Sequence, residues 1–487
     1  MSASIAISPK GPEGPPKDMT LEVSPPDQVL WLSRTLEKAG FETWVVGGAI
    51  RDVVLGRPAG DWDFATRAHP KEIMAAFRRT VPIGVDHGTV GVLAPDGTLY
   101  EVTTFRRDVE TFGRRAVVEF AERIEEDLAR RDFTLNALAW HPGRDELLDP
   151  WNGATDMAAQ ILRTVGDPAR RFAEDLLRVL RALRFAGEFG LTIEGETWRA
   201  LLSAVPQLSQ LSAERIQEEL MKVLAQARSP SVALGLYAES GVFAELYPEL
   251  AVGLPIAGAE EEGSSDTPQG DAVRSQVDVD HTLCACDAVP RTRPLVRLSL
   301  LFALASTTQG RPDVDVKDTT RNAEGPPQDT TLRAIETLME RLRFSNADTK
   351  RVATVAASLA PAPPSEEPVG LRRWLNRVGP GHFTDIARAW LAGARAYEGS
   401  EMGHVIRRIK ALRTVLREDP PLTIGDLALD GTDLKELGLS PGPQFGEILR
   451  YLLEEVLDRP KVNNRADLKA LAEKGGFLMD PRPDPNR

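Results

Sequence analysis

The chain has little of three things that would direct it to a particular environment or partner. It contains only two cysteines, Cys284 and Cys286, which can build neither a disulfide framework nor a four-ligand zinc site. No apolar run reaches membrane-spanning length, and the amino terminus lacks a signal-peptide pattern. Acids outnumber lysine and arginine, which gives a net charge of −13. We therefore expect a cytoplasmic protein without a membrane partner, which binds any nucleic acid through a local basic surface.

What the chain does have is length and an ordinary globular composition. Its 487 residues, 42% hydrophobic and 27% charged, suffice for about three or four domains. The predicted order is a disordered tail (1–20), an α+β head with a small mixed sheet (21–162), an all-α neck (163–250), a helical body (251–418) and a helical tail (419–487). Composition also predicts disordered inserts at 260–277 and 307–330.

One stretch, from Trp44 to Asp63, carries a pattern typical of phosphate binding. A short apolar run breaks at Gly47 and Gly48, and helical spacing then resumes. A strand that turns through glycines into a helix points backbone N–H groups at whatever lies over the turn, which suits a phosphate. Arg51, one helical turn later, can bind the same anion.

Carboxylates follow this turn. Asp61 and Asp63 are spaced by two, so both side chains face one side of an extended chain and could hold Mg²⁺ against substrate phosphates. Glu101, in the strand-like segment 99–105, is either a third carboxylate of the same site or a solvent-facing side chain. A solvated loop explains an isolated Asp-x-Asp, so the prediction depends on the glycines, arginine and acids occurring together.

Two later segments add charged residues. In 126–139 an Arg-Arg-Asp run precedes an apolar helical pattern, and either a bound anion or an ion pair between Arg131 and Asp127 would account for it. The preceding segment, 106–121, is polar without periodicity and fits a mobile loop beside the site.

The segment 169–189 predicts one amphipathic helix, because its apolar positions recur at helical spacing. Its polar row steps by three through Asp175, Arg178, Arg181 and Arg184. A salt-bridged solvent face would explain most such rows. Here one aspartate cannot neutralise three arginines, so we expect two unpaired cations that suit an anion or a base edge.

These motifs together resemble the nucleotidyltransferase superfamily that includes DNA polymerase β, and more narrowly the bacterial tRNA nucleotidyltransferase and poly(A) polymerase family. The resemblance carries specific motifs over about 42–250 and continues more loosely to position 473. It favours Glu101 as a third catalytic carboxylate. It also implies that the nucleotide triphosphate is positioned by Gly47, Gly48, Arg51 and Arg131.

The pattern Glu174-Asp175-x-x-Arg178 is similar to a motif of class II tRNA nucleotidyltransferases in which Asp and Arg hydrogen-bond the incoming base. One carboxylate acceptor and one guanidinium donor match the Watson–Crick edges of cytosine and adenine, whereas guanine and uracil present the opposite polarity. The resemblance thus implies selection of C and A without a nucleic-acid template, with further nucleotide contacts from Arg181 and Arg184.

The resemblance predicts an enzyme that adds CCA to tRNA 3′ ends from CTP and ATP, with Mg²⁺ as cofactor and release of pyrophosphate. A-adding, CC-adding and poly(A) polymerases of the same family share this chemistry. The sequence shows no strongly basic carboxyl-terminal extension, which disfavours a poly(A) polymerase. A catalytically inactive tRNA-binding scaffold is the alternative from a different class. The oligomeric state stays open.

Two features of the carboxyl-terminal half bear on this prediction. Some relatives carry a metal-binding His-Asp pair near the end of an apolar helix, but Ala303 and Leu304 occupy those positions here. His281 alone is more typical of a capping or core residue, so we expect no second catalytic site. The helix expected over 403–417 has a basic row that is either tRNA-contacting or simply solvated, formed by Arg407, Arg408, Lys410 and Arg413.

Overall fold

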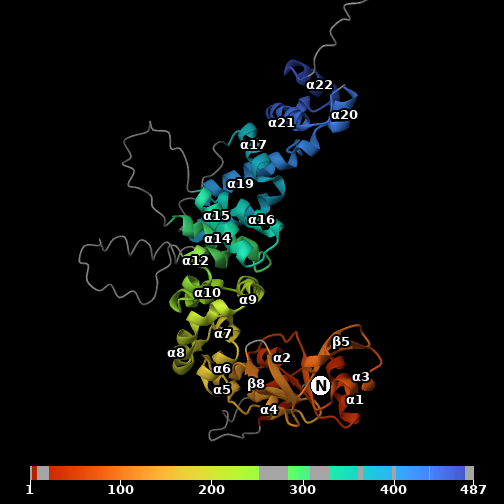
Figure 1. Ribbon diagram of the computed structural model, residues 1–487, viewed down its shortest axis with the longest axis vertical. Helices are drawn as coiled ribbons and strands as arrows, with labels where there is room; N and C mark the ends of the chain where they lie inside the picture. Colours follow the sequence, from red (N-terminus) through yellow and green to blue (C-terminus); the bar gives the residue numbers. More distant parts are fainter. Residues whose placement is uncertain are drawn as a thin grey trace, which may run out of the picture. The chain divides into compact units, whose positions relative to one another are not determined.

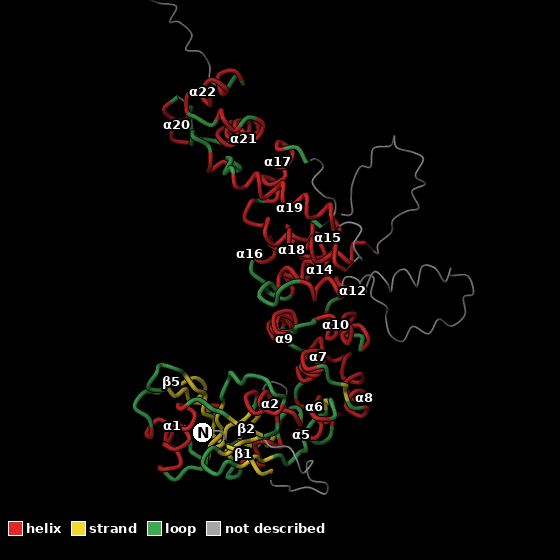
Figure 2. Tube along the Cα trace, turned by 180° about the vertical axis from the view of Figure 1, so that it is seen from behind, coloured by secondary structure: helices red, strands yellow, loops and turns green. Residues whose placement is uncertain are grey.

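The computed structural model describes residues 3–7, 21–112, 115–251, 283–307, 328–359, 366–396, 402–437 and 439–477. Within them the chain forms two compact units. The first takes in the described residues up to Val223 together with 232–246, and the second takes in 224–231 and the described residues from 247 onward. All described strands belong to the first unit (Figure 2).

The first unit is built on a mixed sheet in the strand order β2-β1-β11-β10-β3-β4-β7-β6-β5. β3 runs antiparallel to β4, and β4 runs parallel to β7. β5, which is labelled in Figure 1, is an edge strand. The strands are β1 (Ala3–Ile7), β2 (Leu21–Val23), β3 (Thr43–Val46), β4 (Asp63–Thr66), β5 (Thr80–Gly84), β6 (Thr89–Leu93), β7 (Leu99–Thr104), β10 (Ala139–His141) and β11 (Glu146–Leu148).

Strand alternation divides the core of this sheet between two faces. On one face Trp44 and Ala65 belong to a buried apolar cluster that also includes side chains of α4 (Ile124–Ala129). Their neighbours along β3 and β4 are buried too and point the other way. The helices α1 (Asp27–Lys38) and α3 (Pro70–Ala76) also pack against strands of the sheet. β3 is buried on both faces, which explains the continuous apolar run from Trp44 to Val46 in the sequence.

Two segments of the head differ from the sequence-based expectation. Residues 3–7, predicted within a disordered tail, form β1 and pair with β2 and β11, since a short alternating Ala/Ile segment can join an existing sheet edge. The segment 106–121, predicted as a mobile loop, contains an antiparallel hairpin of β8 (Arg106–Phe112) and β9 (Arg115–Phe120). A hairpin is held by its own backbone hydrogen bonds, so it needs no apolar periodicity.

The single helix predicted over 169–189 is wrong. α6 (Pro168–Glu174) ends at Glu174, Asp175 is extended with φ −153° and ψ 105°, and α7 (Leu177–Phe189) follows. The Asp175 carboxylate accepts the backbone N–H of Leu177 at 3.1 Å, which stabilises the start of a new helix at this corner. The helices that follow are α8 (Gly195–Ala204), α9 (Ala213–Gln226), α10 (Pro230–Glu239) and α11 (Val242–Leu246).

The second unit is helical wherever the structure describes it. Its helices are α12 (Pro248–Ala251), α14 (Pro294–Thr307), α15 (Gln328–Arg341), α16 (Asn346–Ala357), α17 (Pro368–Val378), α18 (Phe383–Ala396), α19 (Met402–Arg417), α20 (Gly431–Glu436), α21 (Pro443–Asp458) and α22 (Arg465–Lys474). Buried Arg297 donates to the backbone carbonyls of Val289, Leu224 and Ala227, which ties α14 to the start of this unit. No described helix is long and apolar enough to cross a membrane.

Several expectations for the second unit are not tested by the structure. Ala303 and Leu304 lie in α14, but their side chains are not described, and His281 lies outside the described residues. The insert predicted at 260–277 also lies outside them, as does 308–327 of the second insert. The boundaries of the five segments predicted from the sequence therefore stay predictions.

Candidate active site

The turn between β3 and α2 (Gly48–Val54) brings several predicted site residues together. Gly47 adopts φ +77°, a left-handed conformation that favours glycine. A Cβ atom at this position would lie 3.5 Å from Nη1 of Arg131 and 3.6 Å from Oδ2 of Asp63. A guanidinium and a carboxylate therefore flank the turn, and glycine keeps the space between them open.

The carboxylates of Asp63 and Glu101 lie on the same face of the sheet. The parallel register of β4 and β7 makes Asp63 and Glu101 cross-strand neighbours. Desolvation, followed by the negative charge of Glu101, raises the pKa of Asp63 to about 6; Asp61 acts in the same sense and Arg131 opposes it. Asp63 nevertheless keeps solvent-accessible surface. The predicted grouping of these carboxylates thus occurs in the structure, and it carries more negative charge than Arg131 offsets.

This excess of negative charge fits a cation. Carboxylate oxygens suit Mg²⁺, which proteins usually hold through one or two carboxylates together with substrate phosphates. Across the described ranges, no three His, Cys, Asp or Glu side chains gather closely enough to enclose a metal ion by themselves. The donor set therefore fits a cation that shares its ligands with a bound substrate, and not a closed structural metal site.

Arg131 makes the ion pair that the sequence left as an alternative. Its Nη2 lies 3.3 Å from Oδ2 of Asp127, and its Nη1 donates to the carbonyl of Asn136 at 3.1 Å. Burial alone would raise the pKa of Asp127, but Arg130 and Arg131 lower it below its usual range. Nε of Arg131 is buried without a partner in the described part of the chain. The ion pair thus fixes the guanidinium beside Gly47 while one of its donors stays unsatisfied.

Arg51 lies over the same turn. A Cβ atom at Gly48 would lie 3.4 Å from its Nη2, and its guanidinium carbon lies 4.6 Å from the ring centroid of Phe189. Its Nη1 donates to Oδ1 of Asn136 at 3.1 Å, and its Nη2 pairs with Asp52 at 2.9 Å. The side chain is only 13% exposed, so it is held in place before any ligand binds.

A polar chain links the turn to α7. Asp132 accepts a hydrogen bond from the side-chain amide of Asn136 at 3.0 Å and from Nε of Arg181 at 2.7 Å. Burial alone would raise the pKa of Asp132, but Arg181 and Asn136 lower it. Arg181 is therefore not an unpaired cation. Asn136 is not among the predicted site residues, although it lies in the same segment as Arg131.

Arg178 makes three hydrogen bonds at the corner between α6 and α7. Its Nη1 donates to the carboxylate of Glu174 at 2.8 Å and to the carbonyl of Arg171 at 2.9 Å, and its Nη2 donates to the carbonyl of Arg130 at 3.1 Å. Although burial alone would raise the pKa of Glu174, Arg178 and Arg171 lower it. In the structure Arg178 therefore pairs with Glu174, and not with Asp175 as the helical row suggested.

Asp175 meets a different arginine. Its Oδ2 accepts from Nη2 of Arg215, at the start of α9, at 2.8 Å. The two side chains are 34% and 35% exposed, so both remain accessible to a ligand. Sequence reasoning missed Arg215 because it lies 40 residues from its partner. Its only sequence signal is the Ser-Ala-Glu-Arg run that starts α9.

Arg184 is buried and paired. Its Nε lies 2.8 Å from Oε2 of Glu219, whose side chain is 1% exposed, and its Nη1 lies 3.3 Å from Glu188. The expectation of unpaired cations along this helix is therefore wrong, since the neutralising acids come from other segments of the chain. In this conformation the Arg184 guanidinium is not exposed to a nucleotide.

The predicted tRNA-binding residues lie in the second unit. α19 exposes Arg407, Lys410 and Arg413, while the half-buried Arg408 lies 5.7 Å over the ring of Trp390. This exposure is compatible with a solvated face as well as with a bound RNA backbone. The tRNA contact therefore stays a prediction.

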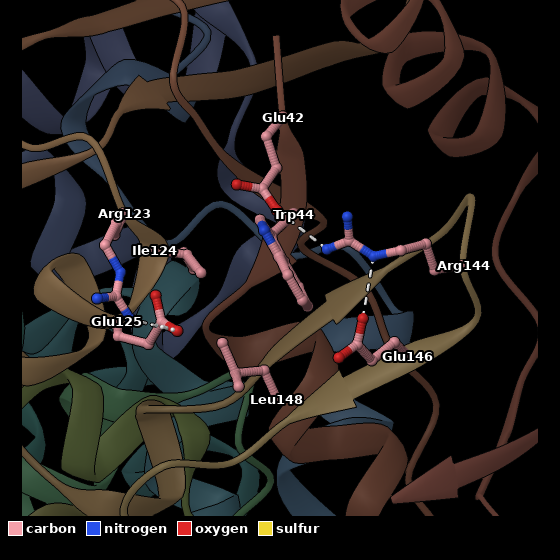
Figure 3. Close-up of a pocket in the computed structure, with 8 residues that line it drawn as sticks. All are labelled: Glu42, Trp44, Arg123, Ile124, Glu125, Arg144, Glu146 and Leu148. Atoms are coloured by element: carbon pink, nitrogen blue, oxygen red, sulfur yellow. Dashed lines mark hydrogen bonds and ion pairs between the residues drawn. The ribbon is translucent and has the colours of Figure 1, made fainter. Parts of the chain in front are cut away.

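A separate pocket of about 270 Å³ lies in the first unit (Figure 3). Arg144 lies 4.9 Å over the ring of Trp44 and pairs with Glu42 and Glu146, each at 3.0 Å. These charges are satisfied within the protein, and the pocket includes none of the predicted site residues. It is lined by Glu42, Trp44, Arg123, Ile124, Glu125, Arg144, Glu146 and Leu148.

Comparison with known proteins finds relatives of the segments that carry this geometry. Residues 43–163 match the poly A polymerase head domain, and residues 190–254 match a probable RNA and SrmB-binding site of polymerase A. The CCA-adding enzymes of Anoxybacillus flavithermus and Geobacillus thermodenitrificans are 46% and 44% identical to this chain over 226 and 223 residues. Over these residues the chain is similar to the tRNA nucleotidyltransferase and poly(A) polymerase family. These alignments cover 46% and 45% of this chain, and the chain spans about half the length of the two relatives, 56% and 54%.

Solved structures of CCA-adding enzymes share this fold over most of the chain. The Bacillus stearothermophilus CCA-adding enzyme in complex with CTP has a TM-score of 0.67 at 29% identity, over 92% of this chain and 97% of that one. The Thermotoga maritima CCA-adding enzyme complexed with tRNA_CCA shares the fold at a TM-score of 0.52 and 19% identity, over 92% and 95%. The predicted α+β head followed by helical regions is confirmed.

Proposed function

We propose that this chain adds the CCA terminus to tRNA 3′ ends from CTP and ATP in the cytoplasm, releasing pyrophosphate. The observation that carries the proposal is the meeting of Asp63 and Arg131 at Gly47, with Glu101 and Asp61 close enough to raise the pKa of Asp63. The relatives support it, because the curated proteins named above are CCA-adding enzymes and the Bacillus stearothermophilus enzyme was solved with CTP.

In this reaction the 3′-oxygen of the tRNA attacks the α-phosphorus, the hydroxyl proton is released, and the bond to pyrophosphate breaks. Arg51 and Arg131 would bind triphosphate oxygens across the space that Gly47 leaves open. Nucleotidyltransferases of this kind generally use a divalent metal. We propose Mg²⁺, held by Asp61 and Asp63 with Glu101 beside them. When bound, it would lower the pKa of the hydroxyl and neutralise the leaving pyrophosphate.

Base selection is proposed for the α6–α7 corner. Asp175 already accepts from Leu177 and Arg215, but each carboxylate oxygen has a second lone pair for the exocyclic amine of cytosine or adenine. Every donor contact of Arg178 in the structure goes to Glu174 or to a backbone carbonyl. Its predicted contact with the base therefore requires Arg178 to exchange or share a partner. In this conformation Arg215 is the guanidinium nearest to the proposed acceptor.

Recognition of the RNA backbone is proposed for α19 of the second unit. Arg407, Lys410 and Arg413 are exposed there and could each neutralise a phosphate. The overall negative charge means that binding would be local and would weaken as salt is added.

Incubation with tRNA that lacks its last three nucleotides, followed by sequencing of the product, tests the proposal. With CTP and ATP present we expect C, C and A to be added in that order. Addition of A alone to tRNA ending in CC, of two C residues alone, or of a long A tract would assign the chain to another activity of the family. An absence of pyrophosphate release with both CTP and ATP, on tRNA lacking its last three nucleotides and on tRNA ending in CC, would identify an inactive scaffold. The Asp63→Asn variant, purified in parallel, controls for contaminating polymerases.

A further inference from the structure

The sheet presents an uncovered apolar surface beside the catalytic carboxylates. We define it by Val81 and Ile83 of β5 and Leu99 of β7, which are 44%, 45% and 48% exposed. A Cβ atom at Gly91 would lie 2.6 Å from Cδ1 of Ile83 and 3.1 Å from Cδ1 of Leu99. The glycine therefore forms the floor over which the two side chains converge, and the three aliphatic groups make one continuous platform.

Sheet register connects this platform to the carboxylates. Val81 pairs with Gly91, and Gly91 pairs with Glu101, which is the cross-strand neighbour of Asp63. Paired residues point to the same face, and neighbouring strands are about 4.8 Å apart, so the row from Asp63 to Val81 spans about 14 Å. Leu99 precedes Glu101 by two and thus shares its face. The platform and the carboxylates are parts of one surface.

The charges around this surface indicate what it binds. Asp63 and Glu101 would repel an RNA phosphate that no metal ion or arginine neutralises, whereas the sugar and base of a nucleotide present uncharged faces to an aliphatic surface. Two exposed arginines, Arg78 and Arg79, precede β5 at the outer edge of the same sheet. They can neutralise phosphates that lie beyond the platform. Three side chains bury far too little area for a stable dimer.

We infer that this platform holds the last nucleotide or two of the acceptor RNA, so that the terminal 3′-hydroxyl reaches the carboxylates. The inference rests on the proposed function and adds a positioning surface for its RNA substrate. Val81, Ile83 and Leu99 contact sugar and base faces without reading base identity. The residues act on the RNA and not on the incoming nucleotide, which separates their effect from that of Asp175.

Replacing aliphatic groups of the platform by serine tests the inference kinetically. In the double variant Ile83→Ser, Leu99→Ser we expect KM for truncated tRNA to rise about three- to tenfold, from the loss of two partly buried aliphatic contacts. KM for CTP should stay within about twofold. Leu202→Ser on α8, whose leucine is 39% exposed, is the matched control and should leave both values unchanged. An unchanged KM for tRNA in a folded double variant would overturn the inference.

A photochemical measurement on the wild-type chain makes the test independent of any folding defect. A tRNA whose 3′-terminal nucleotide is 4-thiouridine should cross-link to the peptide that spans 80–99. Cross-links confined to other peptides would overturn the inference. So would a wild-type dimer that dissociates on Leu99→Ser, because the platform would then bind a second copy of the chain. If the wild type adds no nucleotide to any tRNA, the proposed function fails, and the cross-link still decides whether RNA occupies the platform.

Discussion

The carboxylates beside Gly47 and the corner between α6 and α7 lie in the same compact unit, yet their charges are balanced in different ways. Beside Gly47, desolvation and the negative charges of Glu101 and Asp61 raise the pKa of Asp63, and Arg131 only partly offsets them. At the corner every acid has an arginine partner: Glu174 is paired with Arg170, Arg171 and Arg178, and Asp175 is paired with Arg215.

The difference suggests two kinds of site. A cluster with excess charge is destabilising by itself and is relieved when an ion of opposite sign binds, so it suits a bound cation. A cluster in which every acid is already ion-paired fixes side-chain positions and gains little from an added cation. It can instead offer remaining lone pairs and donors to a neutral base edge. Metal binding and base reading would thus be separated in space.

Removal of a carboxylate from the unbalanced cluster should have the largest effect. We expect Asp61→Asn or Asp63→Asn to lower nucleotide addition by at least about a thousandfold, since each would remove a charged ligand of the proposed Mg²⁺ from the reacting centre. Single-turnover addition of C to truncated tRNA measures it, with circular dichroism to show that the fold is kept. Activity within tenfold of the wild type would contradict the two-carboxylate assignment.

At the balanced corner the expected loss concerns choice of base more than rate. Asp175→Ala removes the proposed acceptor for the exocyclic amine and leaves Arg51 and Arg131 in place. Preference for CTP and ATP over UTP and GTP should therefore fall by about ten- to a hundredfold, the value of one hydrogen bond to a charged group. Single-nucleotide addition with each of the four triphosphates measures it. Asp175→Asn keeps one acceptor oxygen and should lose less.

If the alanine variant instead keeps wild-type selectivity at a lower overall rate, the corner is structural and another group reads the base. If the wild type adds only A to tRNA ending in CC, base reading by Asp175 can stand while the CCA product does not. The two outcomes thus separate the role of the residue from the identity of the product.

The turn after β3 could be predicted from the sequence because its residues are contiguous, whereas β1 and the β8–β9 hairpin of the same unit could not. Gly47, Arg51 and Asp63 lie within one stretch, so strand, turn and acid spacing could be interpreted locally. The fold class and the grouping of Asp63 with Glu101 were implied by the family resemblance that these local motifs carry, and the structure contains both.

The pairing of the arginines could not be predicted in the same way. Arg181 finds Asp132 at a distance of 49 residues, and Arg184 finds Glu219 at 35. No local count of charges reveals such partners, so the row looked more cationic than it is. The break at Asp175 was hidden for a related reason: no glycine or proline marks it, and a side-chain hydrogen bond to Leu177 stabilises it.

A smaller effect should separate Arg215 from the other arginines of the corner. Arg215→Gln leaves Asp175 without its ion-pair partner while keeping a neutral donor. Because the pair is about one-third exposed, we expect selectivity for CTP and ATP to change by only about two- to fivefold, with KM for tRNA unchanged. Arg199→Gln on α8 removes an exposed ion pair with Glu196 and is the matched control. A change in selectivity as large as that of Asp175→Ala would mean that Arg215 itself contacts the base.

The smallest expected effect is on stability, and its sign follows from the pKa of Asp63. The folded value is about 6 and the ordinary value is 3.8, so between these pH values the folded chain holds a proton that the unfolded chain has lost. The contribution of Asp63 to stability is therefore greatest at low pH and declines as pH rises toward 6. Because Asp63 keeps solvent-accessible surface, the decline should amount to about 1 kcal/mol and not the full value of the shift.

Urea unfolding of the wild type and Asp63→Asn between pH 4 and 7.5 measures this effect, because titration of groups that do not interact with Asp63 cancels in the difference between the two proteins. The variant should gain about 1 kcal/mol relative to the wild type across this range. Added Mg²⁺ at pH 7.5 should raise the stability of the wild type and not that of the variant, since binding relieves the same repulsion. A pH-independent difference, or an equal response of both proteins to Mg²⁺, would show that the carboxylates beside Gly47 are as well balanced as those of the corner.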